Sequence, residues 1–296
     1  MLTGIICGFF AAFFQSGSYL CTRLFIKRHQ DDIGTLLALS HIVMGVISVL
    51  LVLVLKPDEM PDWRVYARPL AGTAGFYILG QTFLFAALIN AEASRVSPLL
   101  GLKIVILAVI SASALRQPLG WTQWAAVTLC ALAVLLLSYS GKRLRLSAVA
   151  LVVLACLSYS LSDLNIKVLA GHFSHLGVMH GAVLGAGLTY ILCGAVACVV
   201  VMFKVRRPSR DAWMYSLPFA LSWLIAMVFL FCCFALIGVV FGNIIQSTRG
   251  LISIGLGFLI SCMGFERLEP KITRTVLVRR LIAGTFMTGA VFLYHL

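Results

Sequence analysis

Apolar residues run in long stretches along nearly the whole chain, separated by charged residues, Pro, Asn and Gly. Ten stretches are long enough for a helix to cross about 30 Å of hydrocarbon. The eighth and ninth share one apolar run, which we divide at GVVFGN because Gly238, Gly242 and Asn243 are the breakers available there. The pattern predicts an all-α integral membrane protein of ten transmembrane helices, at residues 2–25, 34–55, 68–90, 95–115, 121–139, 147–169, 176–203, 212–237, 241–264 and 277–295.

Composition supports this class. The chain has 296 residues, of which 61% are hydrophobic and 11% charged. A water-soluble domain of this size needs far more polar surface, and no loop is long enough to hold one. The net charge of +13 does not indicate nucleic acid, because no basic tract is interleaved with aromatic residues. The expected surroundings are therefore the lipid bilayer.

Lys and Arg predict the orientation. The odd-numbered loops and their flanks carry 16 of the 23 basic residues and the even-numbered loops carry 5, which leaves two within spans. Because basic residues favour the cytoplasmic side, we expect the odd-numbered loops in the cytoplasm and both termini outside. A bacterial inner membrane is the expected location.

The chain also divides into two similar halves, residues 1–140 and 141–296, within one membrane domain. Lys103 in span four and Arg249 in span nine are 146 residues apart, and spans two and seven each contain one histidine, His41 and His180. Polar residues with i, i+4, i+8 spacing recur in spans one and six: Gln15, Tyr19 and Arg23, then Tyr159, Asp163 and Lys167. Since five helices per half is an odd number, the second half is expected to enter the membrane inverted, as in many carriers.

With these features the chain resembles the EamA-like branch of the drug/metabolite transporter superfamily. The segment GFERLEP at 264–270 is similar to the G-E-R-L-type motif that ends spans four and nine in that family. In the first half, LRQPLG has Gln117 where the glutamate is expected, and Gln15-Ser16 stands where the family favours Trp-Gly. The resemblance implies a ten-helix fold and a transport function, with spans four and nine among those that line the cavity.

Lys103 and Arg249 are the main candidates for substrate binding. A Lys or Arg near the centre of a bilayer costs about 2.5–3.5 kcal/mol, so it normally faces a cavity or a partner. Two at matched positions suit an anionic substrate, with Arg supplying a fork for carboxylate or phosphate and Lys a point charge. The alternative is a structural pair, held by helix carbonyls or reaching to the interface.

The other candidates surround these two. Asn243, Gln246 and Arg249 share a helical face beside Ser247, and Tyr19, Tyr77, Tyr159 and Trp223 are possible lining residues. Arg23 and Lys167 end spans one and six and are further candidates for substrate binding. Asp163 is expected to pair with Lys167 four residues on, or else to be a proton or cation site. His41 and His180 either relay protons or are packed and hydrogen-bonded.

Nothing in the sequence indicates an enzyme, cofactor or metal site. The chain contains no G-x-x-x-x-G-K-[ST], H-E-x-x-H or G-x-S-x-G. The expected function is a secondary active transporter with alternating access for a small organic anion or zwitterionic metabolite, as a monomer or homodimer. The alternatives are a flippase for an anionic lipid-linked substrate and, third, a membrane enzyme acting on lipid headgroups.

Overall fold

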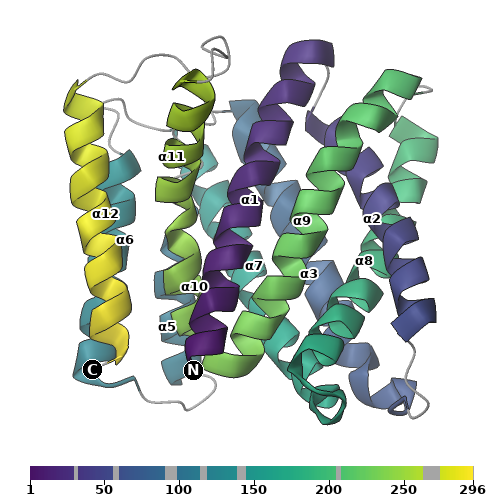
Figure 1. Cartoon of the computed structure of the whole chain (residues 1–296), viewed down its shortest axis with the longest axis horizontal. Coiled ribbons are helices and arrows are strands. Elements are labelled where there is room, and N and C mark those ends of the chain that lie inside the picture. Colours follow the sequence, from purple (N-terminus) through teal and green to yellow (C-terminus); the bar gives the residue numbers. More distant parts are fainter. Residues whose placement is uncertain are drawn as a thin grey trace.

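A computed structural model describes residues 1–29, 33–55, 60–90, 99–113, 119–138, 145–204, 208–262 and 274–295. This part of the chain is a bundle of long helices without a strand. The helices lie side by side along the vertical of Figure 1, and both termini lie at the same end. The all-helical class predicted from the sequence is therefore confirmed.

The helices of the first half follow the predicted spans closely. Their bounds are α1 Leu2–His29, α2 Ile33–Leu55, α3 Trp63–Asn90, α5 Leu102–Ser113 and α6 Trp121–Ser138. Helix α3 begins five residues earlier than predicted, because Asp62 caps it by accepting a hydrogen bond from the Arg64 amide at 3.1 Å. Pro69 then falls near the helix start, where a missing amide hydrogen is tolerated.

The second half contains more pieces. Its bounds are α7 Leu146–His172, the short 3₁₀ helix η1 Ser174–Leu176, α8 Val178–Lys204, α9 Arg210–Ile237, α10 Val239–Ser247, α11 Arg249–Cys262 and α12 Arg274–His295. The predicted break near GVVFGN is confirmed at Gly238, whose φ of 80° ends α9 and precedes α10. Glycine suits this position because it adopts positive φ without a steric cost.

Predicted span nine is not one continuous helix. It breaks at Thr248, between α10 and α11, so that Arg249 is the first residue of α11. Span four has a similar break: Leu99 is helical, Leu100 and Gly101 form a turn, and α5 begins at Leu102, one residue before Lys103. Both basic residues therefore start a helical segment inside a predicted span.

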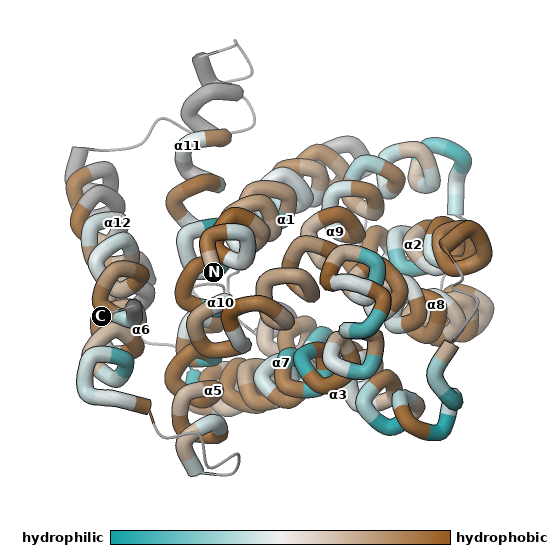
Figure 2. The backbone as a smooth tube through the Cα atoms, turned by 60° about the horizontal axis from the view of Figure 1, so that its bottom comes forward, coloured by the Kyte–Doolittle hydropathy of each residue, from teal (hydrophilic) through white to brown (hydrophobic). Residues whose placement is uncertain are grey.

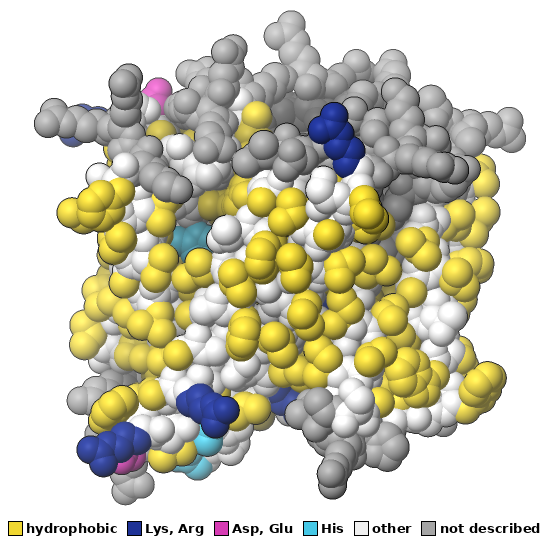
Figure 3. All heavy atoms as spheres, turned by 180° about the vertical axis from the view of Figure 1, so that it is seen from behind, with side chains coloured by type: hydrophobic (Ala, Val, Ile, Leu, Met, Phe, Trp, Pro, Cys, Tyr) yellow, Lys and Arg dark blue, Asp and Glu magenta, His cyan; other side chains and the backbone are white. Residues whose placement is uncertain are grey.

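The outer surface of the bundle is apolar. Six helices in the described residues are long and apolar enough to cross a membrane, namely α1, α2, α3, α7, α8 and α9. Large side chains such as Val54, Met202 and Phe292 are exposed, and hydrophobic side chains cover the middle of the face in Figure 3, with most Lys and Arg side chains toward its ends. Lipid is the solvent that matches such a surface.

Helices from the two halves pack against each other in pairs. Helix α1 packs on α9, α3 on α7, α2 on α8, and α6 on α12. Figure 2 shows α6 and α12 together to one side of the other helices. Helices α2 and α8 cross at Gly45 and Gly194, where a Cβ added to Gly194 would lie 2.9 Å from the Gly45 Cα. Only a glycine pair permits this backbone contact.

Candidate functional site

An ion pair between Lys103 and Asp163 lies in the interior of the bundle. The Lys103 Nζ is 2.6 Å from Asp163 Oδ2, and the side chains are 16% and 7% exposed. Lys103 comes from α5 and Asp163 from the middle of α7. The predicted local pair of Asp163 with Lys167 is wrong: Lys167 is half-buried one turn further along α7, and the carboxylate is oriented across to α5 instead.

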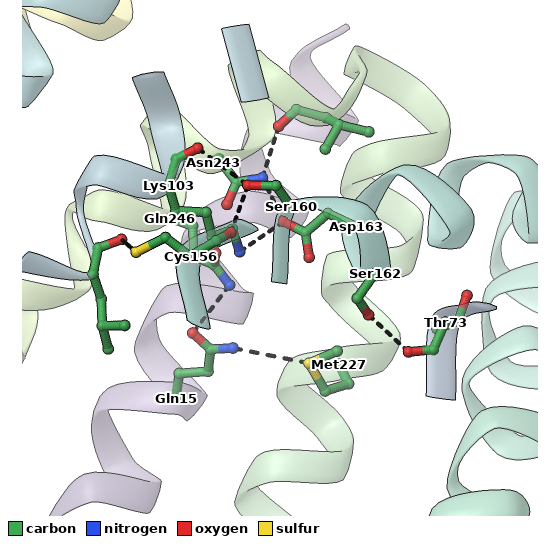
Figure 4. A network of polar contacts seen from close by, with 12 residues as sticks. Gln15, Thr73, Lys103, Cys156, Ser160, Ser162, Asp163, Met227, Asn243 and Gln246 are labelled. Carbon is green, nitrogen blue, oxygen red and sulfur yellow. Dashed lines mark hydrogen bonds and ion pairs between the residues drawn. The ribbon is translucent and has the colours of Figure 1, made fainter. Parts of the chain in front are cut away.

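Asn243 extends this ion pair to helix α10. Its Nδ2 donates to Asp163 Oδ2 at 2.8 Å and to its own-helix carbonyl of Val239 at 2.9 Å. Asp163 Oδ2 therefore receives both a charged and a neutral donor, and Figure 4 shows these side chains converging from different helices. The carboxylate of Asp163 thus links α5, α7 and α10.

Arg249 lies in a different environment. Its Nη1 donates to Gln15 Oε1 at 3.2 Å, and its guanidinium carbon lies 6.0 Å from the centre of the Tyr19 ring. Gln246 donates to the same Gln15 oxygen at 3.0 Å. In the described part of the chain no Asp or Glu forms an ion pair with Arg249. Its charge is thus met by a neutral amide and a ring face.

The two charged residues are joined by one chain of contacts. Asn243 and Gln246 are one turn apart on α10, so the path runs from Lys103 through Asp163 and α10 to Gln15 and Arg249. Gln15 is 2% exposed and its Nε2 also faces the Met227 sulfur at 3.9 Å. The expected shared face of Asn243, Gln246 and Arg249 is therefore occupied by a polar network.

Two serines hold the backbones of the basic residues in the same way. The Ser16 hydroxyl lies 2.9 Å from the Arg249 carbonyl and 2.8 Å from that of Ala12. The Ser160 hydroxyl lies 3.4 Å from the Lys103 carbonyl and 2.7 Å from that of Cys156. Ser16 and Ser160 are 144 residues apart, close to the spacing of the two basic residues. The matched sequence positions thus correspond to matched contacts.

A row of aromatic side chains, here called the aromatic wall, leads away from Arg249. Its members are Tyr19, Trp223, Tyr190, Tyr77 and Tyr159. Trp223 Nε1 donates to the Tyr190 hydroxyl at 2.7 Å, and the remaining neighbours have ring centres 6.2 to 6.5 Å apart. The wall ends at Tyr159, which is on α7 one turn before Asp163.

His41, on helix α2, contacts two members of the aromatic wall, Tyr77 and Tyr190. It is buried on α2, with Nδ1 2.6 Å from the Leu37 carbonyl and Nε2 3.0 Å from the Tyr77 hydroxyl. Both ring nitrogens thus have partners, which agrees with the packed, hydrogen-bonded alternative for this residue. Its counterpart in α8 is Tyr190, at a ring distance of 6.1 Å, rather than the predicted His180.

Several predicted site residues lie elsewhere. His180 is exposed near the start of α8, outside the polar network. Ser247 faces α6: its hydroxyl donates to the Ile244 carbonyl at 2.6 Å and accepts from the Cys130 thiol at 3.2 Å. The side chain of Arg23, Gln117 and the segment at 264–270 lie outside the described residues.

Gln15 and Tyr190 belong to the observed site but were not predicted as site residues from the sequence. Gln15 has a visible signal, because it begins the i, i+4, i+8 series in the first half and breaks an apolar run. Tyr190 has a weaker one, since it is 149 residues after His41, the same spacing as Gly45 and Gly194. Neither spacing says which side chains touch.

Within the described ranges no group of three His, Cys, Asp or Glu side chains could hold a metal ion. The cysteines described there are free thiols, and most are buried among apolar helices. The chemistry of the site is therefore that of one ion pair, one arginine, several amides and an aromatic row.

Long apolar helices around a buried polar network define a multi-pass membrane protein. The model of the EamA-like transporter family matches residues 2–139. Over these residues, just under half of the chain, the sequence is similar to a family of membrane transporters of the drug/metabolite transporter superfamily.

The comparison with solved structures covers the second half as well. A crystal structure of a protein 14% identical in sequence superposes with a TM-score of 0.72, over 100% of this chain and 98% of the other. At this identity the likeness concerns the fold alone. No curated protein matches the chain.

Proposed function

We propose that this chain is a secondary active transporter for a small organic anion or zwitterionic metabolite. The observation that carries the proposal is Arg249, which starts α11 within the bundle of apolar helices and, among the described residues, contacts neutral groups only. A cation at this depth costs several kcal/mol unless it has a counter-charge. A carboxylate or phosphate of the substrate supplies that charge, and the guanidinium fork can bind it through two hydrogen bonds.

The helix breaks next to Lys103 and Arg249 also support the binding of an anion. Lys103 is the second residue of α5 and Arg249 the first of α11. The N-terminal end of a helix carries a partial positive charge, which favours anions and disfavours cations. Helix end and side chain thus act together on a bound anion. Discontinuous helices with this polarity bind the acidic groups of substrates in other carriers.

Lys103 has a different role in substrate binding from Arg249, because Asp163 already neutralises its charge. When Asp163 takes up a proton, the positive charge of Lys103 becomes free to meet a second substrate oxygen. Proton binding and anion binding then favour each other by linkage. In this scheme Asp163 is the coupling residue and Arg249 the permanent anchor.

Alternating access would use two inverted five-helix halves, residues 1–140 and 141–296, that form ten crossings in total. The matched contacts of Ser16 and Ser160 support this relation, as does the Gly45–Gly194 crossing. If each helix is replaced by its counterpart in the other half, the α1–α9 pair becomes the α7–α3 pair. The same replacement leaves the α2–α8 and α6–α12 pairs unchanged. Odd-numbered loops would then face the cytoplasm, in a bacterial inner membrane.

Ligand-induced stabilisation of purified protein tests the proposal. We expect succinate, glycerol 3-phosphate or alanine to raise the apparent Tm, because a ligand that binds only the folded state stabilises it by mass action. Arg249→Gln should remove this shift and Arg249→Lys should retain part of it. An unchanged shift in Arg249→Gln contradicts the assignment of Arg249.

The same assay distinguishes the alternative function, a flippase for an anionic lipid-linked substrate, from the proposed one. For a flippase, a short-chain lipid phosphate would raise the Tm and the three water-soluble probes would not. Uptake of a stabilising probe into proteoliposomes then distinguishes a transporter from a binding protein or a headgroup enzyme.

A further inference from the structure

The polar network and the aromatic wall join at both ends. At one end the Arg249 guanidinium lies over the Tyr19 ring. At the other end Tyr159 and Asp163 are one turn apart on α7. Contacts therefore run from Arg249 along the wall to α7, and return through Asp163, α10 and Gln15 to Arg249. We call this closed series the circuit.

The circuit involves every α-helix described here except two. Helices α1, α3, α7, α8, α9, α10 and α11 contribute its members, and α2 and α5 add His41 and Lys103. Of the described α-helices, only α6 and α12 stay outside it; they pack on each other to one side in Figure 2 and contact α5 and α10.

The two sides of the circuit offer different chemistry. One side carries the cation of Arg249 and the Lys103–Asp163 ion pair. On the other side, the Tyr77 and Tyr190 hydroxyls are already hydrogen-bonded to His41 and Trp223. Tyr77 and Tyr190 are also the most buried members of the wall, at 8% and 1% exposure.

The accessible members of the wall lie next to the charges. Tyr19 is 37% exposed beside Arg249, and Trp223 and Tyr159 are half-buried. The Tyr159 ring is seated against α3 at Gly80, where an added Cβ would lie 2.7 Å from the ring. The backbone at Gly80 thus fixes this ring in position, and what the wall presents is ring surface.

From this geometry we infer that the substrate carries a planar unsaturated ring in addition to its anionic group. The anion binds Arg249 and the ring stacks on the aromatic wall, with Tyr19 and Trp223 closest to the anion. The inference rests on the proposed function and names the substrate class for the same site. Ring pairs in offset or edge-to-face contact are more stable than burial of equal apolar area, so a saturated ring of the same size is the natural comparison.

Matched probes test this inference by binding to the purified full-length protein. One pair is phenyl phosphate and cyclohexyl phosphate, and the other is 4-hydroxybenzoate and 4-hydroxycyclohexanecarboxylate. Each pair keeps the anionic group and changes only the ring. In the unmodified protein we expect the unsaturated member of at least one pair to bind about two- to tenfold more tightly.

Variants of the aromatic wall test whether it causes the preference for an unsaturated ring. Tyr19→Leu should reduce the ratio of the two dissociation constants toward one, whereas Tyr19→Phe should keep it, because the ring face is retained. Trp223→Leu provides a second variant should Tyr19→Leu fail to fold. Trp121→Leu is the control, since Trp121 is 86% exposed on α6, outside the circuit.

The outcomes separate the two proposals. Equal affinity for both members of each pair, with both lost in Arg249→Gln, overturns the ring inference and leaves the proposed function intact. Binding that persists in Arg249→Gln overturns the proposed function. If no probe binds the unmodified protein, the ring inference is overturned.

Discussion

Lys103 and Asp163 form an ion pair of 2.6 Å between two helices of the bundle interior, and Asn243 completes the shell around the shared oxygen. The pair joins the two halves of the chain, because Lys103 belongs to the first and Asp163 to the second. The pair is largely enclosed by protein, with Lys103 16% and Asp163 7% exposed. Pairs of this kind are costly to break by removing one partner and much less costly to remove as a whole.

We therefore predict a stability difference between single and double variants. Asp163→Asn leaves the Lys103 charge without a partner, and Lys103→Met does the same to Asp163. Each should lower the free energy of unfolding by about 3–5 kcal/mol. The double variant should recover most of this loss. Thermal or denaturant unfolding in detergent measures the cycle, and additive losses in the double variant would contradict a direct pair.

Arg249 should respond in the opposite way. Because its partners are a neutral amide and a ring face, Arg249→Gln removes a charge that has no counter-charge and should leave stability unchanged or raise it. It should nevertheless remove anion binding. Arg210→Gln, at the exposed start of α9, is the matched control and should change neither. A large loss of stability in Arg249→Gln would indicate a structural role instead.

Anion binding should become tighter when the negative charge of Asp163 is removed. The carboxylate contacts Lys103 from α5 and Asn243 from α10. Asp163→Asn removes the one negative charge of this set, so the net positive charge available to an anion rises. Dissociation constants of the anionic probes for the unmodified protein and for Asp163→Asn check it, and weaker binding in the variant would contradict the part proposed for Asp163.

The crossing of α2 and α8 gives a prediction about packing alone. Gly194→Ala places a Cβ 2.9 Å from Gly45 Cα, and backbone cannot move aside as a flexible side chain can. We expect a loss of about 1–3 kcal/mol. Gly75→Ala in α3 is the control, since nothing lies within 4 Å of its added Cβ. That substitution should be neutral or stabilising by up to about 1 kcal/mol, because alanine favours a helix.

The orientation of the chain can be measured independently of substrate. Both termini lie at one end of the bundle, so reporters fused to either end should give the same result. The distribution of Lys and Arg predicts that both read as outside the cytoplasm. Two cytoplasmic signals would reverse the orientation, and two different signals would contradict the placement of the termini at one end.

Much of this arrangement could be predicted from the sequence, because the bilayer imposes a simple rule on apolar length. The all-helical class, the long apolar helices, the break at Gly238 and the matched positions of Lys103 and Arg249 follow from hydropathy and spacing. The partner of Asp163 does not. Lys167 is four residues away on the same helix and is the local choice, whereas Lys103 is distant in sequence and becomes its neighbour only when α5 packs on α7.

The break at Thr248 shows a second limit. Thr248 has helical backbone angles near φ −62° and ψ −14°, and its hydroxyl and that of Ser247 bond back to carbonyls in the preceding turn. Such local hydrogen bonds compete with the regular helical ladder. Ser and Thr are common enough inside helices that no residue pattern marks this interruption in advance.

Helices α6 and α12 pack on each other and contribute no side chain to the circuit. This separation leaves room for engineering. Residues on their lipid-facing surfaces, such as Trp121 and Phe292, can be exchanged for spectroscopic labels or crosslinkers without altering the groups around Arg249. A probe on this pair would report on the bundle while the binding chemistry stays that of the native protein.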